Sequence, residues 1–271
     1  MLTRTIPSTG EKIAAVGVGT WRGFDVGSGT RERTPLRAVL ETLLDGGASV
    51  VDSSPMYGRA EGVAGDLLAD MNRRDDAFIT TKVWTRGRKQ GIAEMEESFR
   101  LFHTDRIDLM QVHNLVDWRT QIDTMRHWKA EGRIRYLGYT DYRPQAFGDL
   151  MDAVRAEPVD FLQFCHSIDL PDAEDEILPF CAANGIATLI NLPFGGGGLL
   201  SRLGRKPLPA LAVDLGCSTW AQFCLKYVIS HPAVTCAIPG TANPAHMADL
   251  VSAARGELPD EATRSRMRTL I

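Results

Sequence analysis

Four titratable side chains stand in or just after short apolar stretches in the first half of the chain. Asp52 follows Val50-Val51 and opens a turn-like segment, 52–58, that delivers Tyr57. Lys82 lies near the end of AFITTKV, and His113 ends IDLMQVH. Aspartate is a poor strand residue, and a proline three positions later cannot stay in a ladder. A requirement other than sheet stability is therefore expected at Asp52 and Tyr57.

A lysine, a carboxylate and a tyrosine in contact form a proton-donating group. A phenol titrates near ~10, and a nearby ammonium stabilises the phenolate and lowers that pKa, each unit being worth ~1.4 kcal/mol. We expect Asp52 to hold Lys82 charged and fixed, so that Tyr57 becomes a proton donor to an oxygen gaining negative charge. His113 would give that oxygen a second hydrogen bond. A carbonyl that accepts hydride develops such an oxygen.

Other chemistries fit these residues less well. The set pairs no serine or cysteine nucleophile with a histidine, which disfavours acyl transfer. The six histidines form no H-x-x-x-H or H-x-H motif, so a metal-dependent hydrolase is disfavoured and no metal site is predicted. Taken singly, each residue also has a structural explanation: a solvated strand-end lysine, a satisfied histidine, a packed loop tyrosine and a capping aspartate. Only their joint placement favours a site.

The elements that must bring the four residues together alternate between apolar strands and amphipathic helices. Continuous apolar strands separated by helices indicate a parallel sheet covered on both faces. Eight such units predict an α/β fold, a (β/α)₈ TIM barrel formed by one domain, 1–271, in which strand ends converge on one pocket. The predicted strands are 15–20, 49–54, 77–83, 107–113, 134–140, 160–165, 187–192 and 234–240, and the predicted helices are 34–47, 60–71, 91–103, 119–131, 144–156, 174–184, 218–230 and 243–254.

Two local patterns refine this architecture. Thr34 and Pro35 predict a helix start, as N-cap and first helical residue. Residues 3–14 predict an N-terminal β-hairpin that could plug the barrel. An open doubly wound sheet is the alternative, but the sequence after Gly17-Val18-Gly19 lacks the third glycine of a dinucleotide-binding turn.

Seven motifs along the chain resemble those of the aldo-keto reductase family, in order and over almost its whole length. They are GVGTW, the segment Val-Asp-Ser-Ser-Pro-Met-Tyr-Gly at 51–58, ITTKVW, DLMQVHN, FLQFC, PFGGGGLL and IPGT. The resemblance implies NAD(P)H-dependent reduction of aldehydes and ketones on a barrel that binds an extended nicotinamide dinucleotide. It also implies that Asp52, Tyr57, Lys82 and His113 are the catalytic tetrad, with Tyr57 as the acid.

The same resemblance implies a set of cofactor-binding residues. Thr140, Asp141 and Gln163 would hold the carboxamide, although the family usually shows Ser-Asn in place of Thr140-Asp141. Asn191 stands where the family often has a ring-stacking tyrosine. NADP(H) is expected, with NAD(H) as the alternative; cations from Arg202, Arg205 and Lys206 would assist His246 at the 2′-phosphate. The full set is Thr20, Trp21, Thr140, Asp141, Gln163, Asn191, Leu192, Pro193, Phe194, Gly196, Gly198, Ile238, Gly240, Thr241 and His246.

Aromatic and apolar residues follow the first four predicted strands and suggest a mostly apolar substrate pocket. The pocket set is Trp21, Met56, Trp84 and Asn114, with Phe24 and Trp118 nearby. Because little chain follows the helix predicted at 243–254, we expect an open site and broad specificity for small carbonyl compounds.

Composition bounds the remaining interpretations. The 271 residues are 44% apolar with a formal net charge of −4, which gives no sign of a nucleic-acid surface. No apolar run suits a signal peptide or a membrane span. Five cysteines without a C-x-x-C motif indicate reduced thiols and a cytoplasmic protein. Either a monomer or a small homo-oligomer is expected. A catalytically weak, nicotinamide-binding regulatory or redox-sensing protein on the same barrel is the alternative function.

Overall fold

The strands of the computed structural model, which describes residues 1–271, form an antiparallel hairpin and an eight-stranded parallel sheet. In the sheet the strand order is β10-β9-β8-β7-β6-β5-β4-β3. The hairpin consists of β1 (Thr3–Thr5) and β2 (Lys12–Ala14), and the sheet consists of β3 (Val18–Gly19), β4 (Val50–Asp52), β5 (Phe78–Val83), β6 (Ile107–His113), β7 (Ile134–Thr140), β8 (Phe161–Cys165), β9 (Ala187–Asn191) and β10 (Cys236–Ala237).

The sheet closes on itself between its first and last strands. Parallel bridges join Val16 to Ala237 and Gly19 to Gly240. An added Cβ on Gly19 would lie 2.9 Å from the carbonyl oxygen of Ile238, so the closure needs a residue without a side chain there. Eight parallel strands joined in this way confirm the predicted (β/α)₈ barrel.

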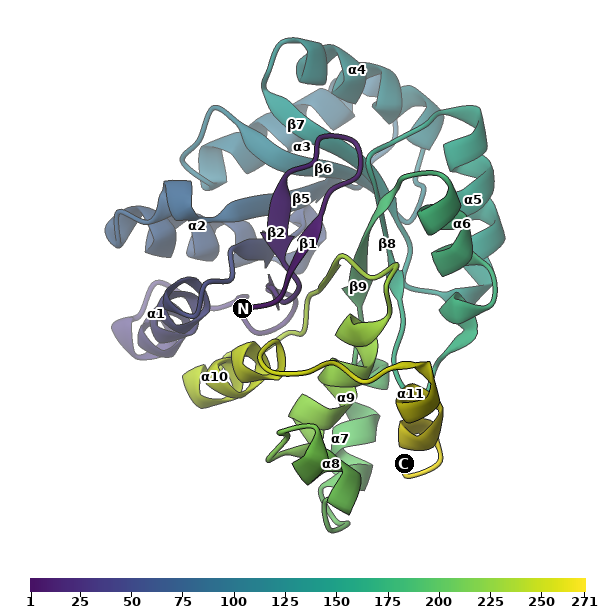
Figure 1. Ribbon diagram of the computed structural model, residues 1–271. Coiled ribbons are helices and arrows are strands. Elements are labelled where there is room, and N and C mark those ends of the chain that lie inside the picture. Colours follow the sequence, from purple (N-terminus) through teal and green to yellow (C-terminus); the bar gives the residue numbers. More distant parts are fainter.

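Helices surround the strands, and the hairpin crosses the front of the barrel in Figure 1. The α-helices are α1 (Thr30–Asp45), α2 (Ala60–Asp70), α3 (Arg88–Leu101), α4 (Trp118–Ala130), α5 (Phe147–Ala156), α6 (Ile177–Ala183), α7 (Gly198–Leu203), α8 (Ala210–Asp214), α9 (Trp220–Ser230), α10 (Pro244–Ala253) and α11 (Glu261–Arg268). Short 3₁₀ helices cover Pro55–Tyr57, Arg74–Asp76, Pro144–Ala146, Asp172–Glu174 and Gly195–Gly197.

The start of the first barrel helix was predicted wrongly. Helix α1 begins at Thr30, with Gly29 as its N-cap, so Thr34 and Pro35 lie inside it. The Thr34 hydroxyl donates to the carbonyl oxygen of Thr30 at 2.8 Å instead of capping the helix. Arg33 lies in the first turn of α1, before the predicted start, and pairs with Asp66 of α2 at 2.8 Å. Local sequence patterns do not reveal such a tertiary contact.

The end of the chain contains a helix that the periodicity did not predict. Helix α11 is held by Arg264, which is buried and donates to Ser230 Oγ at 3.0 Å. Its guanidinium also bonds the Tyr227 carbonyl oxygen and the Glu174 carboxylate. A polar helix of this kind gains its stability from specific contacts, which explains why an apolar pattern missed it.

The hydrophobic core has two parts. The larger cluster lies between the strands and the surrounding helices, while the smaller fills the barrel interior. Ile6 and Ile13 of the hairpin belong to the smaller cluster and are almost fully buried, so the hairpin closes the N-terminal end of the barrel as expected. All five cysteines are free and buried. No helix combines the length and hydropathy that a bilayer crossing would require.

We predict that Gly65→Ala destabilises the fold. An added Cβ at this position of α2 would lie 1.9 Å from the carbonyl oxygen of Leu101, so α2 or α3 would have to move. Such overpacking costs about 1–3 kcal/mol, measurable as the free energy of unfolding in urea. Gly148→Ala in α5 is the matched control, since nothing lies within 4 Å of its added Cβ. Equal stability of the two variants would contradict the prediction.

Candidate active site

The four residues singled out in the sequence gather at the C-terminal end of the barrel. Asp52 ends β4, Lys82 is the penultimate residue of β5 and His113 ends β6. Tyr57 ends the 3₁₀ helix that follows β4. The parallel pairing of these neighbouring strands brings the groups together although they are far apart along the chain.

A buried ion pair forms the centre of the group. Lys82 Nζ lies 2.9 Å from both carboxylate oxygens of Asp52 and 2.6 Å from the carbonyl oxygen of Ser53. The side chains of the pair are 1% and 3% exposed. Thr80 also donates to Asp52, at 3.3 Å. Burial disfavours the lysine charge, but Asp52, assisted by Tyr57 and Glu61, outweighs this effect, so the pKa of Lys82 is raised.

Tyr57 is placed over this pair by the turn that carries it. Lys82 Nζ lies 5.1 Å from the centroid of the phenol ring. Ser54 caps the turn by accepting a hydrogen bond from Met56 N at 3.3 Å. Gly58 then leaves the turn with φ of 64°, a conformation that favours glycine. The local sequence therefore directs the ring toward the lysine.

The net effect on the Tyr57 hydroxyl differs from the expectation. Burial raises the pKa of Tyr57, and this outweighs the lowering caused by the Lys82 ammonium. The Asp52 carboxylate adds a further increase in that pKa. The expected net acidification of the phenol is therefore wrong. Lys82 lowers the pKa of Tyr57 as expected, but the depth at which the phenol is buried is a tertiary property that a sequence motif does not reveal.

His113 is neutral at this site. Burial, followed by the nearby Lys82 charge, lowers the pKa of His113 to about 2. Its ring meets Tyr57 edge-on at 5.9 Å between centroids, and Trp84 lies 6.3 Å away. Nδ1 is hydrogen-bonded to Ser54 Oγ at 3.0 Å. A neutral imidazole beside a phenol and an ammonium can orient an oxygen without adding a second charge.

The residues predicted to hold the nicotinamide carboxamide also lie at the C-terminal end of the barrel. Thr140, the last residue of β7, is paired with Gln163 in the middle of β8. Gln163 Oε1 is buried without a hydrogen-bond partner, and so is Asn191 Oδ1 at the end of β9. Buried amide oxygens normally find partners. These two unpaired oxygens fit a ligand that supplies N–H groups, as a carboxamide would.

Asp141 is engaged in a way that the sequence did not reveal. Arg143 donates to both of its carboxylate oxygens, with Nε at 2.9 Å and a terminal nitrogen at 2.7 Å. The backbone N–H of Arg143 adds a third hydrogen bond at 2.9 Å. Asp141 is 1% exposed, so this pairing compensates a buried charge. Its remaining hydrogen-bonding capacity is that of an acceptor only.

The other predicted cofactor residues differ in accessibility. Trp21 is 48% exposed, whereas Thr20 is fully buried and uses its hydroxyl to donate to Ser53 at 2.8 Å. Gly195, Gly196 and Gly197 all have positive φ. Of the remaining members, Pro193 and Ile238 are buried, Leu192, Phe194 and Thr241 are partly exposed, and Gly196, Gly198, Gly240 and His246 are exposed.

A hollow of about 400 Å³ lies beside these positions. It is lined by residues that follow β7, β8 and β9, among them Tyr142, Arg143, Leu192 and Gly196. Arg202, one of the predicted cations, lies 3.5 Å from the Asp169 carboxylate on the same side. Two of the predicted cofactor residues, Leu192 and Gly196, therefore line a concave part of this end of the barrel.

The residues predicted in and near the substrate pocket differ in accessibility. Trp21, Met56 and Trp84 are large, exposed and apolar, and Asn114 has a buried, unpaired Oδ1. The expectation for Phe24 is wrong, because its ring is 0% exposed within the core. Trp118 is partly buried and packs edge-on against Tyr139 at 5.7 Å.

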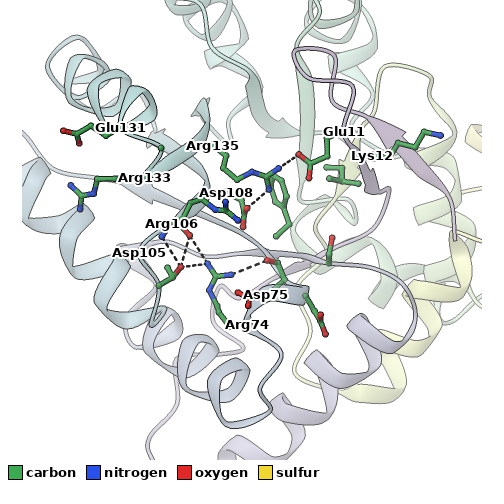
Figure 2. Close-up of a pocket in the computed structure, with 17 residues that line it drawn as sticks. Glu11, Lys12, Arg74, Asp75, Asp105, Arg106, Asp108, Glu131, Arg133 and Arg135 are labelled. Carbon is green, nitrogen blue, oxygen red and sulfur yellow. Dashed lines mark hydrogen bonds and ion pairs between the residues drawn. The ribbon is translucent and has the colours of Figure 1, made fainter.

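A larger cavity of about 670 Å³ opens at the opposite, N-terminal end of the barrel. Figure 2 shows its charged lining, with Arg135 between Glu11 and Asp108. Five cationic and six acidic residues line it, so its charges are largely compensated within the protein. It contains none of the four residues described above, and chemistry is therefore assigned to the C-terminal end.

Comparison with known proteins agrees with this geometry. Residues 15–266 match the model of the aldo/keto reductase family. The chain belongs to the aldo/keto reductase family. The resemblance and the expected type of enzyme, a nicotinamide-dependent oxidoreductase, are confirmed.

Individual members of the aldo/keto reductase family show how far the similarity extends. Aldo-keto reductase YhdN of Bacillus subtilis is 29% identical over 203 residues, 69% of this chain and 60% of the relative. Methylglyoxal reductase YeaE of Escherichia coli is 29% identical over 87% of this chain and 83% of its own. An aldo-keto reductase from Klebsiella pneumoniae, solved with NADPH, superposes with a TM-score of 0.84 at 25% identity, covering 100% of this chain and 95% of that one.

A second buried carboxylate of this aldo/keto reductase was missed in the sequence. Glu61 of α2 is 2% exposed and accepts hydrogen bonds from Thr81 and from Ser98, the latter at 2.9 Å. Burial raises the pKa of Glu61 to about 7, although both hydroxyls and the Lys82 charge lower it. An acidic residue on the apolar face of the stretch AEGVAGDLL is the signal that could have revealed it.

We predict that Glu61→Gln stabilises the protein above neutral pH. The folded-state pKa of Glu61, about 7, exceeds its ordinary value of 4.5, so protonation of this carboxylate stabilises the folded protein relative to the unfolded chain. That stabilisation is present below pH 4.5 and is lost as the pH rises through 7. The variant should therefore gain about 3 kcal/mol relative to the wild type between these limits, measured as the free energy of unfolding against pH.

The exposed Glu41→Gln serves as a control for this pH dependence, because the Glu41 side chain is 42% exposed. Because this carboxylate is not buried, its substitution should bring no comparable gain in stability. Parallel pH curves for the wild type and Glu61→Gln would show that Glu61 titrates normally.

Proposed function

We propose that this member of the aldo/keto reductase family reduces aldehydes and ketones to alcohols, with Tyr57 as general acid and Lys82, Asp52 and His113 as its partners. The observation that carries the proposal is the buried Asp52–Lys82 pair with the Tyr57 ring 5.1 Å from the ammonium. The bound cofactor would supply hydride to the carbonyl carbon.

The residues of the chain would then manage the oxygen and its proton. Because burial raises the pKa of Tyr57, the phenol holds its proton at neutral pH and can give it to the carbonyl oxygen. The phenolate that remains is stabilised by the Lys82 ammonium, which Asp52 holds in its charged form. Neutral His113 would orient the oxygen by a hydrogen bond. A proton from solvent restores the phenol.

We further propose that the cofactor is NADP(H), with NAD(H) as the alternative. The unpaired oxygens of Gln163 and Asn191 support a carboxamide site. Asp141, limited to accepting, would take the carboxamide NH₂. The glycine run would approach the pyrophosphate, and His246 with Arg202 would contact the 2′-phosphate. NADPH in the Klebsiella relative supports this assignment.

The substrate proposal is a small carbonyl compound held between Trp21, Met56 and Trp84. These side chains are 48%, 39% and 42% exposed, so they offer apolar surface to an entering molecule. A relative named methylglyoxal reductase supports a small carbonyl. We propose that residues 1–271 act as one domain, as a monomer or small homo-oligomer. The free, buried cysteines support a reducing compartment such as the cytoplasm.

The alternative function, a nicotinamide-binding regulatory or redox-sensing protein, is supported by two departures at the cofactor site. Asp141 is tied to Arg143, and Asn191 replaces a stacking aromatic ring. Tight NADPH binding without turnover of any carbonyl compound would favour this alternative over the reductase.

We predict that Tyr57→Phe lowers turnover of 4-nitrobenzaldehyde by at least about 100-fold, because loss of a positioned general acid has effects of this size. The measurement is the decrease of NADPH absorbance with time. NADPH binding, followed by protein fluorescence, should change little because the ring is retained.

Tyr136→Phe is the matched control for the loss of a phenol hydroxyl. Tyr136 lies at the N-terminal end of the barrel, where its hydroxyl bonds Thr9 at 2.7 Å, and its variant should keep the turnover of the wild type. If Tyr57→Phe were as active as Tyr136→Phe, the role of Tyr57 as acid would be wrong.

We predict that Gln163→Leu weakens the binding of NADPH and of NADH alike, about tenfold, since a lost hydrogen bond at a buried site costs about 1–3 kcal/mol. Fluorescence titration of each cofactor measures the change. His246→Ala is the contrasting variant, because it should weaken the binding of NADPH but not that of NADH. Unchanged affinities in Gln163→Leu would place the carboxamide elsewhere.

A further inference from the structure

Ser54 links the turn that carries Tyr57 to the imidazole of His113. Its side chain is 0% exposed and lies at the start of the 3₁₀ helix Pro55–Tyr57. Its Oγ accepts a hydrogen bond from Met56 N at 3.3 Å and lies 3.0 Å from His113 Nδ1. The Ser54 carbonyl oxygen accepts from Tyr57 N at 2.9 Å. One residue therefore contacts both groups that would meet the substrate oxygen.

The bond between Ser54 and His113 has two arrangements, which differ in the position of one proton. A serine hydroxyl offers one donor and two acceptor sites, and a neutral imidazole has one donor and one acceptor nitrogen. Either the hydroxyl donates to Nδ1, or Nδ1–H donates to the hydroxyl oxygen. In the second arrangement both acceptor sites of Oγ are filled, by Met56 N–H and by the imidazole.

Counting partners distinguishes these arrangements. Ser54 Oγ has no neighbours within hydrogen-bond distance other than Met56 N and His113 Nδ1. If Nδ1 carried the proton, the hydroxyl hydrogen of a fully buried serine would have no acceptor, which buried polar groups avoid. If the hydroxyl donates to Nδ1, the hydroxyl hydrogen, Nδ1 and the Met56 N–H all have partners, and only Nε2–H is left without one. The backbone N–H of Met56 strengthens this choice because it can only donate.

We infer that Ser54 is a positioning residue whose hydroxyl donates a hydrogen bond to His113 Nδ1. This bond holds the neutral imidazole in the tautomer that carries its proton on Nε2. This inference rests on the proposed function for its catalytic meaning, but not for its geometry. Nε2–H has no partner within the chain and is the donor left to orient a carbonyl oxygen. With the other tautomer, Nε2 would present a lone pair to that oxygen and repel it.

The inference also explains why the imidazole can be useful without a charge. Burial and the Lys82 ammonium lower the pKa of His113 to about 2, so the ring cannot gain a second proton near neutral pH. The ionisable groups that act on this ring or contact it are Lys82 and Tyr57. A neutral ring donates from Nε2 only when Nδ1 is the acceptor, which is the arrangement that Ser54 enforces.

The tautomer can be measured directly, without substrate or cofactor. A long-range ¹H–¹⁵N correlation spectrum of histidine-labelled protein distinguishes a protonated from an unprotonated ring nitrogen, and His113→Asn identifies the signals. We expect His113 to carry its proton on Nε2 at every pH from about 5 to 9, given its depressed pKa. A proton on Nδ1 in the wild-type protein would overturn the inference, whatever the activity.

Kinetics then test what the tautomer does. Ser54→Ala should populate both tautomers and lower kcat for 4-nitrobenzaldehyde about two- to tenfold, as expected for one lost neutral hydrogen bond. KM for NADPH should stay the same. Ser54→Thr, which keeps the hydroxyl, should restore the single tautomer and most of the rate. Ser54→Ala with an unchanged tautomer and unchanged kcat would overturn the inference.

The outcomes separate this inference from the proposed function. An Nε2–H tautomer that is lost in Ser54→Ala, together with full activity of Tyr57→Phe, would support the role of Ser54 while contradicting the proposed acid. A proton on Nδ1 in the wild type, together with an inactive Tyr57→Phe variant, would contradict the role of Ser54 while supporting Tyr57 as the acid. Thermal unfolding of each variant shows whether a change in rate reflects loss of folded protein.

Discussion

The buried pair of Lys82 and Asp52 is the interaction on which the C-terminal end of the barrel depends. Taking two charges out of water is costly, and only close geometry with further hydrogen bonds offsets that cost. Here the ammonium contacts both carboxylate oxygens and the carbonyl oxygen of Ser53. The partners belong to adjacent parallel strands, so the barrel pairing itself supplies the geometry. Losing either partner would leave an uncompensated charge, at a cost of about 3–5 kcal/mol.

The surroundings of this pair set the state of the other two groups. The same burial that strengthens the pair disfavours a phenolate at Tyr57 and an imidazolium at His113. The result is one fixed cation beside two neutral hydrogen-bond donors. A developing negative oxygen would be the one species that all three groups stabilise, and electrostatic groups aimed at a charge before it forms cost little reorganisation. Ser54 belongs to this arrangement because it orients one of the donors.

The two ends of the barrel differ in backbone as well as in charge. At the N-terminal end, the hairpin seals an apolar interior with Ile6 and Ile13, and the charges nearby compensate one another. At the C-terminal end, five non-glycine residues adopt positive φ in the loops after β3, β6 and β9, against two, Asn72 and His103, in the loops that lead into strands. The five are Arg22, Asn114, Leu115, Asp117 and Leu192. Such conformations cost energy and concentrate at functional sites. Stability and chemistry are thus assigned to opposite ends of one scaffold.

The sequence by itself determined the order and type of the barrel elements, because apolar periodicity and turn residues act locally. It therefore determined which side chains stand at the carboxyl ends of strands, including Asp52, Lys82 and His113. Only the tertiary structure decided the net pKa direction of Tyr57, the pairing of Asp141 with Arg143, and the hydrogen bond of Ser54. Each of these depends on how deeply a group is buried and on what lies beside it after folding. Burial and nonlocal contact arise when the barrel closes, and no local pattern encodes their magnitude.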